Sequence, residues 1–106
     1  MPQLLFGPAD AVLDQIADVL ARYEADHPDA KTAFYRQNSA SVRIRVIDPT
    51  FEGLSKAERG RKVWPYLRTL AEDAQADITV LLLLTQDETE KSFGNTDFDN
   101  PVLSEL

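Results

Sequence analysis

The stretch that decides the fold is Ser41–Arg59, SVRIRVIDPTFEGLSKAER. Its first part, Ser41–Ile47, alternates apolar and polar side chains, which is typical of a β-strand with one buried face. Pro49 ends this strand because proline has no N–H to donate to a neighbouring strand. The spacing of Ser55 and Glu58 forms a capping box, which marks the start of a helix. The stretch therefore predicts a strand, a turn and then a helix.

The residues before this stretch predict a helix and a second strand. Pro8–Asp26 carries an apolar stripe at steps of three and four residues, as an amphipathic helix does. Thr32–Arg36 is a short strand, and the tight turn Asn38–Ala40 joins it to Ser41–Ile47. A link this short favours an antiparallel hairpin. The stripe of the helix consists of Val12, Leu13, Ile16, Val19, Leu20 and Tyr23.

The residues after it predict a kinked helix and a third strand. Pro65 lies inside the helix that begins at Ser55, and a kink or a break is expected near Trp64. Ile78–Leu84 is apolar on both faces, as in a strand that is covered twice. Thr85-x-x-Glu88 is a second capping box and predicts one short helical turn. Phe93–Leu106 has no clear period and is interpreted as a tail.

This order of elements predicts an α+β fold, a two-layer α/β sandwich with an α-β-β-α-β core. The last two strands are joined through a helix, so they are expected to be parallel with a right-handed crossover. The sheet would have three mixed strands with helices on one face. We expect a single domain over residues 1–91. Residues 92–106 would form a tail that packs on the domain or on a dimer mate.

The third strand leaves apolar side chains on the face that the helices do not cover. Depending on its orientation, either Leu81 and Leu83 or Leu82 and Leu84 would be open to water. Exposed apolar surface of this kind usually marks an interface. The tail, or a second copy of the chain, is expected to cover it. The tail offers Phe93, Phe98, Val102 and Leu103, and the predicted protein interface consists of Leu81, Leu83, Phe93 and Phe98.

The arrangement resembles the BolA-like family, which is related to the KH type II fold. The resemblance covers roughly residues 40–86. It is carried by the alternating strand Val42–Val46 and by the segment Phe51-Glu52-Gly53-Leu54-Ser55, which is followed by Arg59. In that family such a strand leads through a Phe-x-Gly-x-Ser turn and an Arg into a helix.

The chain departs from the family at the positions that bind an iron–sulfur cluster. Gly60 stands where the family has His after the Arg. Asp77 or Ile78 stands where the family has a His near its last strand, and the loop Asn38–Ala40 offers neither Cys nor His. The resemblance therefore implies the scaffold without the cluster, and we expect neither an iron–sulfur cluster nor zinc.

Composition excludes several classes of site. The chain has no Cys and a single His, His27, at the predicted end of the first helix. Thiolate chemistry is therefore excluded, and a zinc site lacks donors. There is no Gly-x-Ser-x-Gly nucleophile motif, no P-loop and no KH-type Gly-x-x-Gly clamp. We expect no catalytic residue, no metal, no cofactor and no membrane span, and a cytoplasmic location.

Charge leaves two hypotheses for function. The formal net charge is −7, yet nine of the 11 Lys and Arg residues fall within residues 31–68. These cations either pair with the acidic ends of the chain or bind an anionic partner, for which the candidates are Arg43, Arg45, Arg59, Arg61 and Lys62. The first hypothesis is a small non-enzymatic protein-interaction module that can also bind itself as a homodimer. The alternative is a nucleic-acid-binding or regulatory domain, which the negative charge disfavours.

Overall fold

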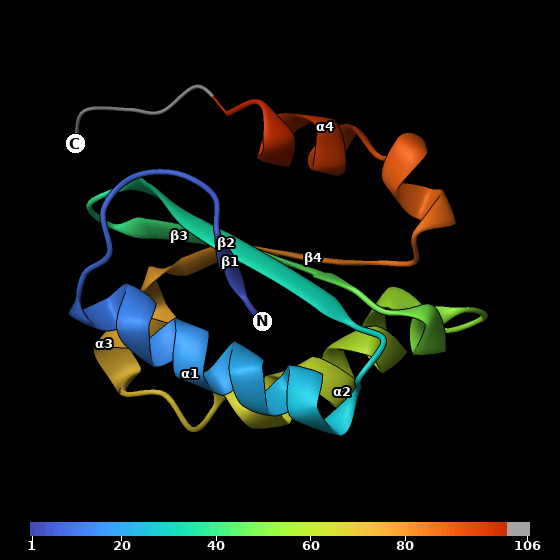
Figure 1. Cartoon of the computed structure of the whole chain (residues 1–106), viewed down its shortest axis with the longest axis horizontal. Helices are drawn as coiled ribbons and strands as arrows, with labels where there is room; N and C mark the ends of the chain where they lie inside the picture. Colours follow the sequence, from blue (N-terminus) through green and yellow to red (C-terminus); the bar gives the residue numbers. More distant parts are fainter. Residues whose placement is uncertain (102–106) are drawn as a thin grey trace.

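A computed structural model describes residues 1–101 of the chain, and its centre is a four-stranded mixed sheet (Figure 1). The strands lie in the order β1 (Gln3–Leu4), β2 (Lys31–Asn38), β3 (Ser41–Ile47) and β4 (Ile78–Leu84). β2 and β3 form the antiparallel hairpin that the sequence predicts, and β4 runs parallel to β3. The α+β fold class is confirmed.

The sheet has one more strand than the sequence predicts. β1 pairs in parallel with β2 and occupies one edge of the sheet. It is only two residues long, too short to show an alternation of apolar and polar side chains. The expected three-stranded sheet was wrong for this reason.

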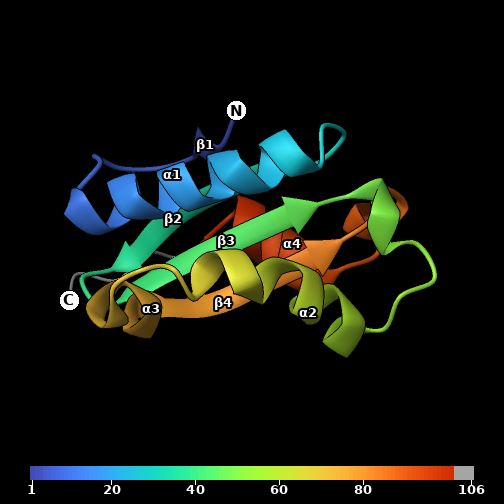
Figure 2. The ribbon, with the colours of Figure 1, turned by 90° about the horizontal axis from the view of Figure 1, so that it is seen from below.

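Helices cover both faces of the sheet, not one as expected. α1 (Ala11–Asp26), α2 (Lys56–Leu67) and α3 (Glu72–Asp77) lie together on one face, and α4 (Phe93–Asp99) lies alone on the other (Figures 1 and 2). α4 falls in the segment that was interpreted as a tail. Its N-cap is Ser92, whose hydroxyl accepts a hydrogen bond from the Asn95 amide at 3.0 Å. We call the side of the sheet under α4 the α4 face.

Local capping sets the helix boundaries. The Asp10 carboxylate accepts from the Leu13 amide at 2.9 Å at the start of α1. The predicted capping box of α2 is present, with Ser55 Oγ accepting from the Glu58 amide at 3.1 Å and the Ser55 amide donating back to Glu58 at 3.0 Å. α2 continues through Pro65 and ends at Leu67, before α3 begins.

The main core lies between β3 and the three helices α1, α2 and α3. Val42, Ile44 and Val46 of β3 are fully buried there. The α1 stripe packs against them through Leu13, Ile16, Val19, Leu20 and Tyr23. A smaller apolar cluster lies on the α4 face around Ala33, Tyr35 and Phe98.

A register irregularity decides which leucines of β4 face which layer. Val42 is opposite Ile78, whereas the next residue, Arg43, is opposite Val80. The shift leaves Thr79 exposed and places Ile78 on the helix-covered side together with Leu81 and Leu83. The leucine that packs on the α4 face is Leu82.

Candidate protein-interaction surface

The α4 face joins two arginines of β3 to two aspartates of α4. Arg43 Nη1 lies 2.8 Å from Asp97 Oδ2, and Arg45 Nη1 lies 2.6 Å from Asp99 Oδ1. The two arginines point to the same side because they are two residues apart on a strand. α4 thus places its carboxylates where the sequence left two cations on an uncovered face.

Phe98 is the only aromatic anchor among the described residues of α4. Its side chain is 1% exposed, and its ring lies 4.8 Å from that of Tyr35. The Tyr35 hydroxyl donates to the Phe98 carbonyl at 2.7 Å. Burial raises the pKa of Tyr35 above its ordinary range, so the hydroxyl keeps its proton and remains a donor. The Arg45 guanidinium stacks over the Phe98 ring at 4.8 Å, a cation–π contact.

The other tail residues that were predicted to cover this face behave differently. Phe93 is 94% exposed. Val102 and Leu103 lie outside the described residues. Leu81 and Leu83, predicted as interface residues on the open face, pack toward α2 and the main core instead. The irregularity at Thr79 shifts the alternation of β4 and turns both side chains to this side. That they belong to a protein interface stays a prediction.

The five cations proposed for an anionic partner do not form one surface. Arg43 and Arg45 lie under α4, and Arg59 of α2 is buried beside Glu88. Lys62 donates to the Thr50 hydroxyl at 2.6 Å, and Arg61 is exposed on α2. Three of the five have a carboxylate partner, so this arrangement does not favour a phosphate-binding surface.

β4 forms the second edge of the sheet, and the described residues place no strand on its outer side. A groove of about 370 Å³ runs along this edge. It is bounded by α2 on one side and by Ser92, just before α4, on the other. The residues that line it are Lys56, Gly60, Trp64, Leu81, Leu82, Leu83, Leu84 and Ser92. The groove combines an unpaired strand with apolar walls.

Arg59 contacts the C-terminal end of this edge. Its Nη1 donates to the Leu83 carbonyl at 2.9 Å and to Glu88 Oε1 at 2.6 Å, and its Nη2 donates to Glu88 Oε2 at 3.0 Å. This bidentate contact with Arg59, together with a hydrogen bond from the Thr85 amide, lowers the pKa of Glu88 to about 2. The Thr85-x-x-Glu88 motif thus anchors an arginine as well as a turn.

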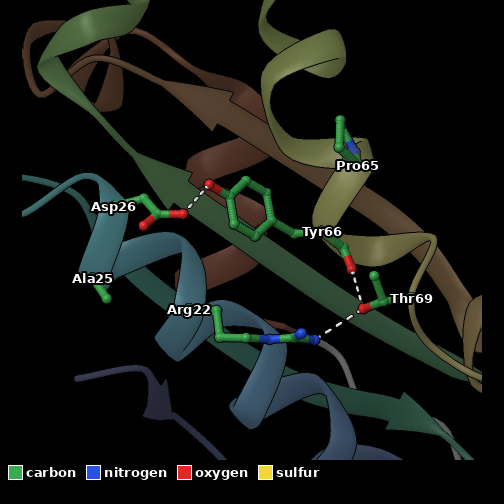
Figure 3. A pocket seen from close by; sticks show the side chains of 6 residues that line it. All are labelled: Arg22, Ala25, Asp26, Pro65, Tyr66 and Thr69. Atoms are coloured by element: carbon green, nitrogen blue, oxygen red, sulfur yellow. Dashed lines mark hydrogen bonds between the residues drawn. The ribbon is translucent and has the colours of Figure 1, made fainter.

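A cavity larger than this groove lies elsewhere, between the C-terminal ends of α1 and α2 (Figure 3). Its volume is about 480 Å³. The Tyr66 hydroxyl donates to Asp26, and Arg22 Nη2 donates to Thr69 Oγ1 at 2.9 Å. Asp26, Tyr66, Arg22 and Thr69 thus each have a hydrogen-bond partner within the cavity lining.

Sequence reasoning missed the residues that complete both surfaces. Trp64 was considered only as the place of a helix kink and Gly60 only as a departure from the family pattern, because the groove depends on where β4 lies in the sheet. Asp97 and Asp99 belong to the acidic C-terminal end of the chain, whose carboxylates were not matched with particular cations. The available signal was the opposite charge of the two segments, because Arg43 and Arg45 share one strand face and the C-terminal end of the chain is rich in Asp and Glu.

No cluster of three or more metal-ligating side chains occurs within residues 1–101. None of the helices in this part of the chain combines the length and the apolar character that a bilayer crossing requires. Comparisons with known protein families, with curated proteins and with solved structures found no match to the chain. The BolA-like resemblance therefore stays a prediction, and the surface is interpreted from its own geometry.

Proposed function

We propose that the chain is a small non-enzymatic protein-interaction module that pairs with a second copy of itself through the free edge of β4. The observation that carries this proposal is the composition of that edge. Ile78–Leu84 is the most apolar segment of the chain, yet none of its residues is fully buried. Soluble proteins normally protect such edges or use them to add a strand.

The backbone of β4 offers the groups that strand addition needs. The Leu84 carbonyl accepts from the Asp48 amide, so Leu84 points its backbone groups toward β3. Backbone groups alternate along a strand, so those of Leu81 and Leu83 point outward. The Leu83 carbonyl already accepts from Arg59, which leaves its N–H and both groups of Leu81 to pair with an added strand.

A two-fold axis at Leu81 satisfies these groups. Leu81 would exchange both of its hydrogen bonds with Leu81 of the second copy, and the Leu83 amide would donate to the carbonyl of Thr79. An antiparallel pair of identical strands has this self-complementary pattern. The result would be a continuous eight-stranded sheet, since each copy contributes four strands.

Charge at the two ends of β4 favours the antiparallel direction. α3 precedes the strand and exposes Glu72 and Asp73. At the other end, the exposed Lys56 lines the groove. Lys56 and the exposed Lys91 also line a second groove, which shares Leu83, Leu84 and Ser92 with the first. Of the acids on the turn beyond the strand, Glu88 lines the second groove but is paired with Arg59, and Asp87 and Glu90 line neither groove. Antiparallel pairing places lysines opposite acids, whereas parallel pairing places like charges together.

Gly60 provides a test that leaves the core untouched. A Cβ at this position meets only Trp64 Cδ1, at 3.7 Å, so a side chain there extends into open space at the groove. Gly60→Glu adds bulk and charge to the groove, and Gly60→Ala is the matched control. Light scattering with size-exclusion chromatography should give a dimer for the wild type and for Gly60→Ala, and a monomer for Gly60→Glu.

The proposal fails if the wild type keeps the 11.9 kDa mass of a single chain up to millimolar concentration. It fails equally if Gly60→Glu dimerises as strongly as Gly60→Ala, because the dimer would then form through another surface.

A further inference from the structure

The α4 face has the form of a binding site that is occupied by a segment of the same chain. The receptor side is built by the sheet: Tyr35 on β2 and Arg43 and Arg45 on β3, with Phe6 packed edge-on against Tyr35 at 5.0 Å. The strands fix the backbone positions of these residues, and Arg43 Nη1 also donates to the Tyr35 hydroxyl on the neighbouring strand at 3.3 Å. The side-chain partners of Arg45, in contrast, lie on α4: Asn95, Phe98 and Asp99.

The occupant is held by few contacts. Only Asn95 and Phe98 of α4 are buried, and the side chains of Asp97 and Asp99 are 63% and 46% exposed. One aromatic side chain and a set of charge-assisted hydrogen bonds therefore secure the helix. Segments with so few buried contacts open at lower free energy than the rest of a fold.

The occupant also leaves part of the receptor unsatisfied. Asp97 accepts only from Nη1 of Arg43, and Arg43 Nε is buried without a hydrogen-bond partner among the described residues. A carboxylate that accepted hydrogen bonds from both Nη1 and Nε of Arg43 would form the bidentate contact that guanidinium groups favour. α4 is thus an imperfect ligand for the surface that it covers.

We propose that the α4 face binds an acidic segment of another protein, in which a phenylalanine is flanked by carboxylates, and that α4 is its resident competitor. The phenylalanine would take the place of Phe98 between Tyr35 and Arg45. The flanking carboxylates would bind Arg43 and Arg45, one of them through Nε as well. This site is separate from the β4 edge, and its occupation does not require a dimer.

The test uses the full chain and a fluorescent peptide with the sequence of residues 92–101, SFGNTDFDNP. Phe98→Ala removes the anchor of the resident helix and leaves the receptor intact. Phe93→Ala is the matched control, because Phe93 is an exposed aromatic residue of the same helix. Fluorescence anisotropy should show at least tenfold tighter peptide binding by Phe98→Ala than by Phe93→Ala or the wild type.

Two further variants make the result specific. Arg43→Gln and Arg45→Gln, added to Phe98→Ala, should abolish the gain in peptide binding. If Phe98→Ala is not folded by circular dichroism, the double variant Asp97→Asn/Asp99→Asn keeps Phe98 and should bind the peptide several-fold more tightly than the wild type.

Three results would overturn the proposal. The first is equal peptide affinity for folded Phe98→Ala and Phe93→Ala. The second is that Phe98→Ala binds a single-stranded RNA oligonucleotide and not the peptide, which would make the arginines a phosphate site. The third is that Phe98→Ala abolishes self-association of the chain, which would assign α4 to the second copy.

Discussion

β3 and β4 are neighbours, run in the same direction and have the same length. β4 is the more hydrophobic of the two strands, yet β3 is the more deeply buried. β3 alternates apolar with polar residues, and Val42, Ile44 and Val46 are completely inaccessible to water. β4 is apolar at nearly every position, and none of its residues is fully buried. Place in the sheet, central or at the edge, decides burial. The surplus of apolar side chains on β4 is the reason for our proposal that a further chain covers this edge.

The largest expected effect is a difference in stability between one substitution in β3 and one in β4. Ile44→Ala should lower the free energy of unfolding by about 2–5 kcal/mol, because it leaves a cavity in the packed core. Leu83→Ala should cost less than half of that, since Leu83 is only partly buried in the single chain. Both are to be measured by urea denaturation in the Gly60→Glu background, where monomers are expected.

An equal loss of unfolding free energy in Ile44→Ala and Leu83→Ala would contradict the difference in burial between the two strands. They would show that β4 is packed as tightly as β3 within one chain, and the apolar surplus would then need no partner.

A smaller effect is expected from the ion pair that closes the end of β4. The pKa of Glu88 is about 2 in the folded chain, below its usual value of about 4.5. Because the pKa of Glu88 is lower in the folded chain than in the unfolded chain, this group stabilises the fold at pH values above about 4.5. The stabilisation is lost as the pH falls from about 4.5 toward about 2. Glu88 is 42% exposed, so solvent screening limits the contribution to about 1 kcal/mol.

Thermal unfolding at several pH values checks this expectation. The wild type should lose stability over that pH interval by more than Glu88→Gln does. Parallel pH profiles for the two proteins would mean that the Arg59–Glu88 contact does not close the edge in solution.

The smallest expected effect concerns the helix beside the edge. Gly60→Ala should raise the free energy of unfolding by up to about 1 kcal/mol, because alanine has the higher helix propensity and its Cβ meets only Trp64. Gly94→Ala should gain less, since its Cβ would lie 3.0 Å from Leu82 Cδ2. Chemical denaturation of both variants measures the difference. A loss of stability in Gly60→Ala would show that the groove is narrower than described.

Much of the fold follows from local sequence patterns. The hairpin, the helix capped by Ser55 and the parallel third strand were all predicted, because alternation and capping act over a few residues. β1 was missed, since two residues carry no pattern. The packing of Leu81 toward the main core was not predictable, because one irregularity at Thr79 reverses the alternation of β4. Pairing between strands, which the sequence does not display, decides where such an irregularity falls.

Much less of the candidate site was predictable. Arg43 and Arg45 were identified as a pair on one face, but their partners Asp97 and Asp99 lie more than 50 residues away along the chain. The groove at β4 required the order of strands in the sheet. Strand order follows from tertiary packing, so a residue such as Trp64 becomes a candidate only when the neighbours of its helix are known.

The most direct test of the β4 edge is amide hydrogen exchange, resolved by NMR, at two adjacent residues. The Leu82 amide points toward β3 and should be protected in every form of the protein. The Leu81 amide points outward, so it should be protected at high protein concentration in the wild type and exchange rapidly in Gly60→Glu. Rapid exchange at Leu81 in the wild type at every concentration would contradict pairing through β4.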